Sequence, residues 1–267
     1  AQTARSVVVV GGGPAGLKAA LTAAQRGHQV TLVEQSGALG GLMIPASVGA
    51  FKEDLRRYLS YLRRQVEKSQ IHVMLHTCAD RALLEHLHPD AVILAVGGRT
   101  VMPPVPGLGT SGAVQAVALL NAGLETAGTR VTILGGGSIG CELALELAAL
   151  DRMVTVVELR DKLAANGNEL YRQDLMLHLE QETRITILTQ TVCTGVTAQG
   201  CTVREKDGGT RVIPHDTFVI AAGLRADADA VEALYGVVPE TYYVGDCKRA
   251  ASITEATTEA YFLGASL

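Results

Sequence analysis

VVVVGGGPAGLKAALTAAQRGHQVTLVE, residues 7–34, is the stretch of sequence that decides the fold. Its four valines form a short, continuous apolar run, which is typical of a buried parallel strand. The pattern Gly11-x-Gly13-x-x-Gly16 follows at once. In such a pattern the first glycine permits a tight turn, the second lets a pyrophosphate approach the backbone, and the third lets the next helix pack closely on the strand. The stretch therefore predicts a strand, a glycine turn and a helix that together bind a dinucleotide.

The remainder of the stretch completes this unit. Pro14 suits the first helical turn, where its missing N–H costs nothing, and residues 15–26 are rich in alanine and leucine. Gly27 is placed to end the helix, and the next strand, residues 30–33, leads to Glu34. A carboxylate there can accept hydrogen bonds from ribose hydroxyls, while the helix N-terminus offers N–H donors to the phosphates.

A second stretch, VTILGGGSIGCELALELAALDRMVTVVE at residues 131–158, repeats every part of the first. Its glycines are Gly135, Gly137 and Gly140, and its acid is Glu158, each 124 positions after its counterpart. A single glycine pattern is a weak signal, because glycine turns between strands and helices are common. Here strand, glycines, helix, second strand and acid agree twice. The sequence therefore predicts two dinucleotide sites.

Composition limits the class of protein. The chain has 267 residues, 48% hydrophobic and 19% charged, which indicates a globular protein of one large or two modest domains. A net charge of -4 argues against a nucleic-acid partner, and we expect no membrane helix, because no uncharged apolar run reaches 18 residues. The short lead before the first strand suggests a piece of a longer protein.

The cysteines and histidines suggest neither disulfides nor a metal centre. The five cysteines are an odd number and none forms C-x-x-C, which favours a reducing, cytoplasmic setting. His86 and His88 lie near Cys78 in sequence, but no further ligand completes a zinc spacing. We therefore expect no metal site.

The order of motifs resembles that of the two-dinucleotide-binding flavoproteins. Besides the two glycine patterns, the chain carries AVGGR at 95–99, AAGLR at 221–225 and VGDC at 244–247. The resemblance implies an α/β fold of tandem Rossmann-like domains, with an NAD domain inserted in an FAD domain. We expect the FAD (or ADP) domain at 1–108 and 217–267, and the NAD(P)H domain at 109–216.

A narrower resemblance covers the same region. GHQVTLVEQSGALGGLM, PDAVILAVGGRTVMPPVPG and ITEATTEAYFLG look like the C-terminal portion of old-yellow-enzyme-type NADH:flavin oxidoreductases, which include 2-enoate reductases, dienoyl-CoA reductases and trimethylamine dehydrogenases. In that family a barrel with FMN and a 4Fe-4S cluster precedes this region, and nothing here resembles that barrel. The resemblance implies a module that passes electrons from NADH through FAD to such a barrel.

The resemblance also implies the site residues. In the FAD site the pyrophosphate turn, the acid, the segment beside the flavin and the residues near the ribityl chain would be Gly11, Gly13, Pro14, Ala15, Gly16, Glu34, Gly40, Gly41, Leu42, Met43, Gly97, Gly245 and Asp246. In the NADH site the corresponding residues would be Gly135, Gly137, Ser138, Ile139, Gly140, Glu142 and Glu158, and Gly223 in the AAGLR motif is a further cofactor-binding residue. Glu142 matches an acid near the nicotinamide, and its alternative is an exposed or capping glutamate. The helix after Asp246 would direct its N-terminus to the flavin.

Two alternatives stay open at this point. One is a free-standing NADH reductase of the ferredoxin or rubredoxin type, and the other is a non-catalytic domain that holds ADP. We expect no catalytic acid, base or nucleophile, because the cofactors carry the chemistry. Glu158 favours NADH over NADPH, since a carboxylate repels a 2′-phosphate, while Arg160 is a counter-signal.

Overall fold

The computed structural model describes residues 3–165 and 167–267. The chain divides into two compact units. The first unit comprises Ala1–Ser47, Lys52–Arg99 and Leu224–Leu267, and the second comprises Val48–Phe51 and Thr100–Gly223. Each unit is built on its own five-stranded sheet, so the expected α/β class is confirmed.

The first unit has a parallel sheet in the order β15-β4-β1-β2-β3. Its strands are β1 (Ser6–Val10), β2 (Gln29–Val33), β3 (His72–Met74), β4 (Ala91–Leu94) and β15 (Thr241–Tyr243). In β1, Val7 and Val9 belong to the core on one face, and Val8 and Val10 to the core on the other. Because side chains alternate between faces, a strand buried on both must be apolar throughout, as the run of valines is.

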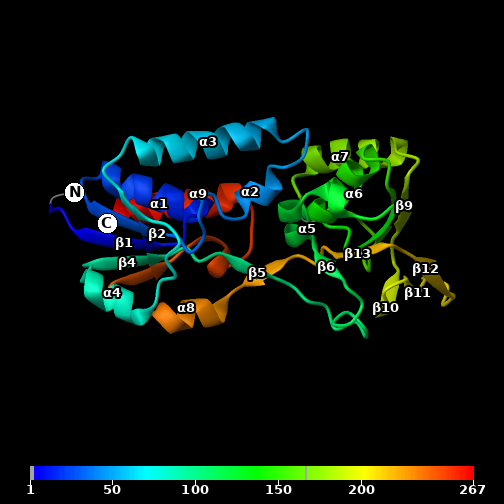
Figure 1. The fold of residues 1–267 in the computed structure, drawn as a ribbon. Coiled ribbons are helices and arrows are strands. Elements are labelled where there is room, and N and C mark those ends of the chain that lie inside the picture. The colour runs from blue at the N-terminus through cyan, green and yellow to red at the C-terminus, as the bar shows by residue number, and fades with distance from the viewer. Residues whose placement is uncertain (1–2, 166) are drawn as a thin grey trace. The chain divides into compact units, whose positions relative to one another are not determined.

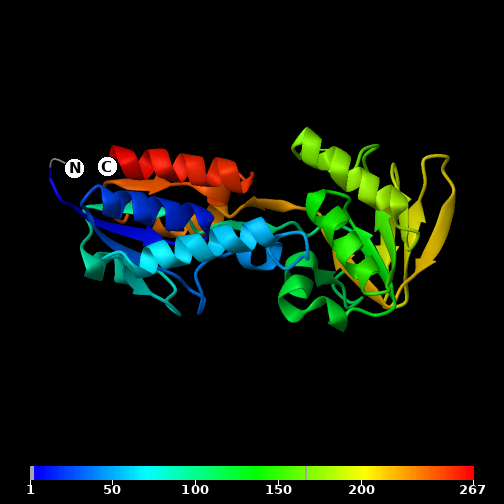
Figure 2. The same ribbon diagram turned by 90° about the horizontal axis from the view of Figure 1, so that it is seen from above.

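Helices cover both faces of this sheet (Figure 1). On one face α1 (Pro14–Gln25), α3 (Glu53–Glu67) and α9 (Ile253–Ser266) lie side by side (Figure 2). On the other lie α4 (Arg81–Leu87) and α8 (Ala228–Leu234), while α2 (Met43–Ala46) precedes α3. A Cβ on Gly264 would lie 2.9 Å from the Ala19 carbonyl oxygen, so α9 approaches α1 closely because this residue has no side chain.

The second unit has a parallel sheet in the order β6-β13-β7-β8-β9. Its strands are β6 (Val114–Gln115), β7 (Arg130–Leu134), β8 (Met153–Val157), β9 (Ile185–Leu188) and β13 (Thr217–Ile220). The helices α5 (Ala116–Ala122), α6 (Ser138–Ala149) and α7 (Glu169–Gln181) share a core with one face. The other face packs on an antiparallel sheet of β10 (Val192–Val196), β11 (Gly200–Arg204) and β12 (Thr210–Pro214).

Short elements complete the chain. The strands β5 (Gly98–Thr100) and β14 (Leu224–Ala226) pair in a two-stranded sheet where the chain leaves and re-enters the first unit. The 3-10 helices are η1 (Leu124–Thr126) and η2 (Gly245–Cys247). Within the described residues, no helix has the length and hydropathy needed to cross a membrane.

The unit boundaries differ from the expected positions after residues 108 and 216. The second unit runs from Thr100 to Gly223, because β13 pairs with β7 and β6 rather than with the first sheet. The last strand and helix do return to the first unit, where β15 pairs with β4 and α9 packs on α1. The last strand, β15, ends at Tyr243, before the VGDC motif.

Candidate functional site

The first glycine turn lies at the carboxyl end of β1, where the chain adds later strands first on one side of β1 and then on the other. After β1 the chain adds β2 and β3 on one side and then crosses to β4 on the other, so the gap between β1 and β4 is a topological switch point. Gly11 has φ +107°, and a Cβ there would lie 2.3 Å from the Ala95 carbonyl oxygen. A Cβ on Gly16 would lie 1.8 Å from the Gly11 carbonyl oxygen. Only glycine fits at either position.

Gly13, in contrast to Gly11 and Gly16, has open space where a side chain would lie. It is the N-cap of α1 with φ -73°, and among the described residues no atom lies within 4 Å of the place where its Cβ would be. Pro14 follows at the first helical position. The space that a side chain would fill therefore stays open in front of the helix N-terminus, where backbone N–H groups and the helix dipole favour an anion such as a pyrophosphate.

Glu34, at the end of β2, is held beside this turn by two backbone donors. The N–H of Gly12 donates to its Oε2 at 2.7 Å, and the N–H of Ser36 donates to its Oε1 at 2.7 Å. The residue is only 7% exposed. Each carboxylate oxygen can accept a further hydrogen bond, so the fixed carboxylate is suited to receive ribose hydroxyls.

The second unit repeats this geometry at the carboxyl end of β7. Gly135 has φ +114°, and its Cβ would lie 2.4 Å from the Ala221 carbonyl oxygen, while a Cβ on Gly140 would lie 2.0 Å from the Gly135 carbonyl oxygen. No described atom lies within 4 Å of a Cβ on Gly137, the N-cap of α6. Ser138 and Ile139 form the first turn of that helix. The second turn is thus open to a ligand at the same place as the first.

Glu158 is held in the same way as Glu34. The N–H of Gly136 donates to its Oε2 at 2.6 Å, and the N–H of Arg160 donates to its Oε1 at 2.8 Å. Arg160 makes this bond with its backbone N–H, so the bond does not fix the direction of the Arg160 guanidinium. Both predicted acids therefore lie beside their glycine turns.

The likeness of the two sites extends to residues that the sequence analysis did not identify. The N–H of Gly40 donates to the Gly12 carbonyl at 2.7 Å, and the N–H of Ala164 donates to the Gly136 carbonyl at 2.8 Å. Leu39 and Leu163 precede these donors. Leu39 lies against Gly12, and Leu163 lies against Gly136. These pairs have the same 124-residue offset as the motifs. That offset was the signal that would have found them.

The segment expected beside the flavin is only partly open. Gly40 has φ +133° and Gly41 has φ +52°, and a Cβ on Gly41 would lie 3.0 Å from the Gly13 Cα. Leu42 is the N-cap of α2. The side chain of Met43 is 1% exposed and packs in the core. The two glycines bring the backbone close to the turn, whereas Met43 has a packing role.

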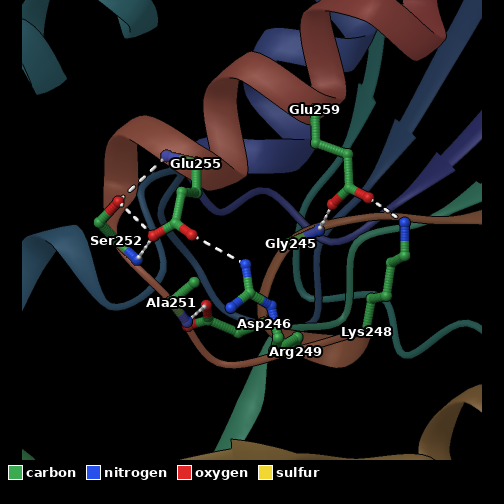
Figure 3. Close-up of polar contacts among 8 residues, drawn as sticks. All are labelled: Gly245, Asp246, Lys248, Arg249, Ala251, Ser252, Glu255 and Glu259. Atoms are coloured by element: carbon green, nitrogen blue, oxygen red, sulfur yellow. Dashed lines mark hydrogen bonds and ion pairs between the residues drawn. The ribbon is translucent and has the colours of Figure 1, made fainter. Parts of the chain in front are cut away.

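Asp246 lies in η2, beyond the carboxyl end of β15, and belongs to the same edge of the first sheet. Burial raises the pKa of its carboxyl, and the N–H of Ala251 donates to it at 3.1 Å (Figure 3). Gly245, before it, has φ +71°, and a Cβ there would lie 2.9 Å from the Cβ of Ala15. The backbone at Gly245 therefore lies close to the start of α1.

Two glutamates of α9 hold the loop that follows (Figure 3). Glu259 accepts hydrogen bonds from the Gly245 N–H at 3.1 Å and from the Lys248 ammonium. Ser252 and Glu255 form a capping box at the start of α9, and Arg249 donates to Glu255 at 2.8 Å. The loop and the helix N-terminus thus form one hydrogen-bonded unit.

The remaining predicted residues also lie at the carboxyl edges of the sheets. Gly97 follows β4 with φ +79°, and Gly223 follows β13 with φ +96°. Glu142 lies in the second turn of α6, where the hydroxyl of Tyr171 donates to its Oε1 at 2.5 Å. Tyr171 was not predicted, because it belongs to no motif. Its place on α7 gives no sequence signal that links it to Glu142.

The cysteines and the possible metal ligands among the described residues add no further reactive group to the site. All five cysteines are free thiols. Burial and the nearby carboxylates of Glu158 and Glu142 raise the pKa of Cys141 to about 12, so its thiol is protonated and unreactive at neutral pH. Over the described part of the chain, no group of three or more His, Cys, Asp or Glu side chains is placed to hold a metal ion.

Comparisons with known proteins agree with this geometry. The pyridine nucleotide-disulphide oxidoreductase family matches residues 5–260. A bilirubin reductase of Mediterraneibacter gnavus (strain CC55_001C) is 34% identical over 96% of this chain and 40% of its own length. An NADH oxidase of Thermoanaerobacter brockii is 34% identical over 82% of this chain and 34% of its own length. The chain therefore spans about 40% or less of the length of these relatives.

Solved structures give the same result. A 2-naphthoyl-CoA reductase in complex with 2-naphthoyl-CoA has a TM-score of 0.95 and 26% identity, over all of this chain and 40% of that one. These comparisons confirm the predicted resemblance to reductases of the old-yellow-enzyme type. The chain belongs to the pyridine nucleotide-disulphide oxidoreductase family, whose members bind FAD and NAD(P)H.

Proposed function

We propose that this chain is the NADH-oxidising flavin module of a larger reductase, with FAD in the first unit and NADH in the second. The observation that carries the proposal is the repeated cradle. Each unit leaves the space at its N-cap glycine open and holds one carboxylate with two backbone N–H donors. A chain that binds a single nucleotide has no need of two such sites.

The assignment of FAD to the first unit rests on elements that this unit has in addition to the glycine turn and its acid, and that the described residues of the second unit lack. The loop from Gly245 to Ser252 and the N-terminus of α9 lie at the edge where β1, β4 and β15 end. We assign Asp246 to the ribityl hydroxyls and the α9 N-terminus to the flavin pyrimidine, where a helix dipole stabilises negative charge. The second unit has the antiparallel sheet β10-β11-β12 in its return segment instead.

The residues of this chain bind and orient, and the cofactors supply the chemistry. When both are bound, NADH gives a hydride to the flavin. We assign the pyrophosphates to the turns at Gly13 and Gly137, and the adenosine riboses to Glu34 and Glu158. No side chain of this chain is assigned as an acid, base or nucleophile in that transfer.

We propose NADH rather than NADPH for the second unit. A phosphate on the ribose would meet the like charge of Glu158, whose carboxylate cannot turn away without losing two backbone donors. Arg160 is next to it and carries the opposite charge, so it weakens this preference without reversing it. The carboxylate is the better match to free 2′- and 3′-hydroxyls.

The length of the relatives indicates that a further part of the protein lies outside this chain. This chain spans 40% of the bilirubin reductase, so most of such a protein lies outside it. We propose that the missing part is an N-terminal barrel with FMN and a 4Fe-4S cluster, which receives the electrons, and that the protein works in the cytoplasm. The final substrate is chosen by residues of that part.

Anaerobic stopped-flow reduction tests this function. Purified protein reconstituted with FAD is mixed with NADH or with NADPH, and flavin absorbance is followed. We expect reduction at lower concentrations of NADH than of NADPH, and Glu158→Ala should narrow the difference. Colourless protein that binds ADP but ignores FAD would contradict the flavin assignment. Faster reduction at low NADPH would contradict the choice of NADH.

A further inference from the structure

An arginine on a neighbouring helix holds the segment that packs on each glycine turn. In the second unit the Nε of Arg172 donates to the Leu163 carbonyl at 2.9 Å. In the first unit the Nε of Arg63 donates to the Leu39 carbonyl at 2.7 Å. The leucines are 124 residues apart, whereas the arginines, on α3 and α7, are 109 residues apart. The same bond is therefore made from two different places in the sequence, which indicates that the sites require it.

Each leucine shares the space over a glycine with the acid of its site. A Cβ on Gly136 would lie against the Cδ2 of Leu163 and 3.0 Å from the Cβ of Glu158. Gly12 and Leu39 make the same contact in the first unit, beside the acid of that unit. Because the glycine has no side chain, the leucine methyl and the glutamate stem both pack on it. The leucine thus leaves the glutamate little room to change its rotamer.

The backbone of the second segment needs to be held in place. Ala164 has φ +47°, a left-handed conformation that a residue with a side chain keeps only when its surroundings impose it. Its N–H donates to the Gly136 carbonyl at 2.8 Å, and its carbonyl accepts from the Gly167 N–H at 3.0 Å. Arg172 bonds the carbonyl just before Ala164. The segment is therefore tied to the glycine turn on one side and to α7 on the other.

The guanidinium of Arg172 offers a charge and a donor, and the two lie in different places. Its Nη1 lies 3.6 Å from the Oε1 of Glu169, an exposed carboxylate one turn earlier on α7. Its Nε, the nitrogen nearest to the stem, is the atom that bonds the segment. The charge is thus balanced by a carboxylate on the surface of the helix, while the donor reaches the site.

We propose that Arg172 is a positioning residue for the choice of nucleotide, because through Leu163 it keeps the Glu158 carboxylate directed to the adenosine ribose. This inference rests on the proposed binding of NADH to the second unit. Without the bond, Leu163 loses its fixed place on the turn, and the carboxylate gains other rotamers. The carboxylate then accepts less well from free ribose hydroxyls and repels a 2′-phosphate less. Binding of NAD+ should therefore weaken more than binding of NADP+.

Calorimetric titration of the full chain with NAD+ and with NADP+, in excess FAD, tests the inference. The two ligands differ only in the 2′-phosphate, so the ratio of their Kd values measures the preference. Arg172→Met has a stem of similar length but neither donor nor charge, and it should reduce the preference for NAD+ by about 3- to 10-fold. Arg172→Gln places an N–H donor at the position of the Nε without the charge. It should keep the preference within about twofold of the wild type.

Three further measurements connect the effect to the site. Leu163→Val shortens the side chain that lies on Gly136, so it should cause the same loss of preference, and it serves as the test if Arg172→Met does not fold. In a Glu158→Ala background, Arg172→Met should leave the ratio unchanged, because Arg172 acts through Glu158. Arg63→Met is the matched control in the first unit. It should raise the Kd of FAD and leave the ratio for NAD+ and NADP+ unchanged.

Other outcomes refute the inference or the function separately. If Arg172→Met changes both Kd values by the same factor, or changes neither, Arg172 only links α7 to the segment. If Arg172→Gln loses the preference as fully as Arg172→Met, the charge acts instead of the donor. If either variant raises the preference for NAD+, the charge attracts the 2′-phosphate. Each of these results overturns the inference, whereas a wild-type protein that binds neither ligand, or prefers NADP+, contradicts the proposed function itself.

Discussion

Gly13 and Gly16 lie three residues apart in one turn, and we expect their substitution to have opposite effects. A Cβ on Gly13 meets no described atom within 4 Å, whereas a Cβ on Gly16 would lie 1.8 Å from the Gly11 carbonyl oxygen. Gly13→Val should therefore block the ligand and spare the fold. Gly16→Ala should damage the fold whether or not a ligand is present.

The magnitudes follow from these distances. In Gly16→Ala, α1 must move away from β1 by about 1.5 Å to restore an ordinary contact, and such overpacking costs about 1–3 kcal/mol. That corresponds to a fall in Tm of about 3–12 °C for a unit of this size. In Gly13→Val, a poorer N-cap costs about 0.5–1 kcal/mol, and the lower entropy of the unfolded chain offsets about the same amount. The Tm without ligand should change by less than about 3 °C.

Thermal unfolding with and without FAD separates the two effects. At FAD concentrations about 100 times its Kd, the wild type should gain about 2.7 kcal/mol of stability, and Gly13→Val should gain none. Gly137→Val, the matched substitution in the second unit, should keep the FAD gain. The reasoning would be refuted if Gly13→Val bound FAD with a Kd within threefold of the wild type. It would also be refuted if its Tm without ligand fell as far as that of Gly16→Ala.

Four further predictions follow from the same structure. Gly137→Val should keep FAD and lose reduction by NADH, as followed by flavin absorbance. Asp246→Asn should raise the Tm without FAD, because burial raises the pKa of that carboxyl and penalises its charge, yet it should weaken FAD binding, as a titration would show. Ser252→Ala removes the cap of α9 and should cost about 1 kcal/mol, seen as faster amide exchange in the first turn of that helix. Burial lowers the pKa of His215 below its ordinary 6.5, so the unfolded chain takes up this proton more readily than the folded chain. The stability of the fold should therefore fall as the pH drops through about 6.5. In thermal scans from about pH 7.5 to 5.5, His215→Gln should flatten this pH dependence.

The sequence was sufficient where one local rule decides the structure. The glycine turns and their acids were predictable, because a strand, a tight turn and a helix in direct succession leave few alternatives. Glu34 and Glu158 lie beside the turns as predicted, although the backbone donors that hold them were not foreseen. One donor to each acid is a glycine that the usual pattern leaves unspecified, Gly12 or Gly136, and the other is the residue two positions after the acid.

The sequence was insufficient where partners are chosen in three dimensions. The run at residues 217–220 falls in the segment that the order of motifs assigned to the first unit, but it pairs with β7. A short apolar strand followed by a glycine fits either sheet equally well, so its own residues cannot choose. The contact of Tyr171 with Glu142 depends likewise on how α7 packs on α6, which no local pattern encodes.

The return of β15 and α9 to the first unit affects how the chain folds during synthesis. The second unit is almost continuous in sequence and can fold as soon as Gly223 has left the ribosome. The first unit must wait for β15, about 150 residues after β4, which takes about 7–30 s at usual rates of translation. Until then one edge of β4 and the α1 surface under α9 stay uncovered, so the nascent first unit is the part most in need of a chaperone.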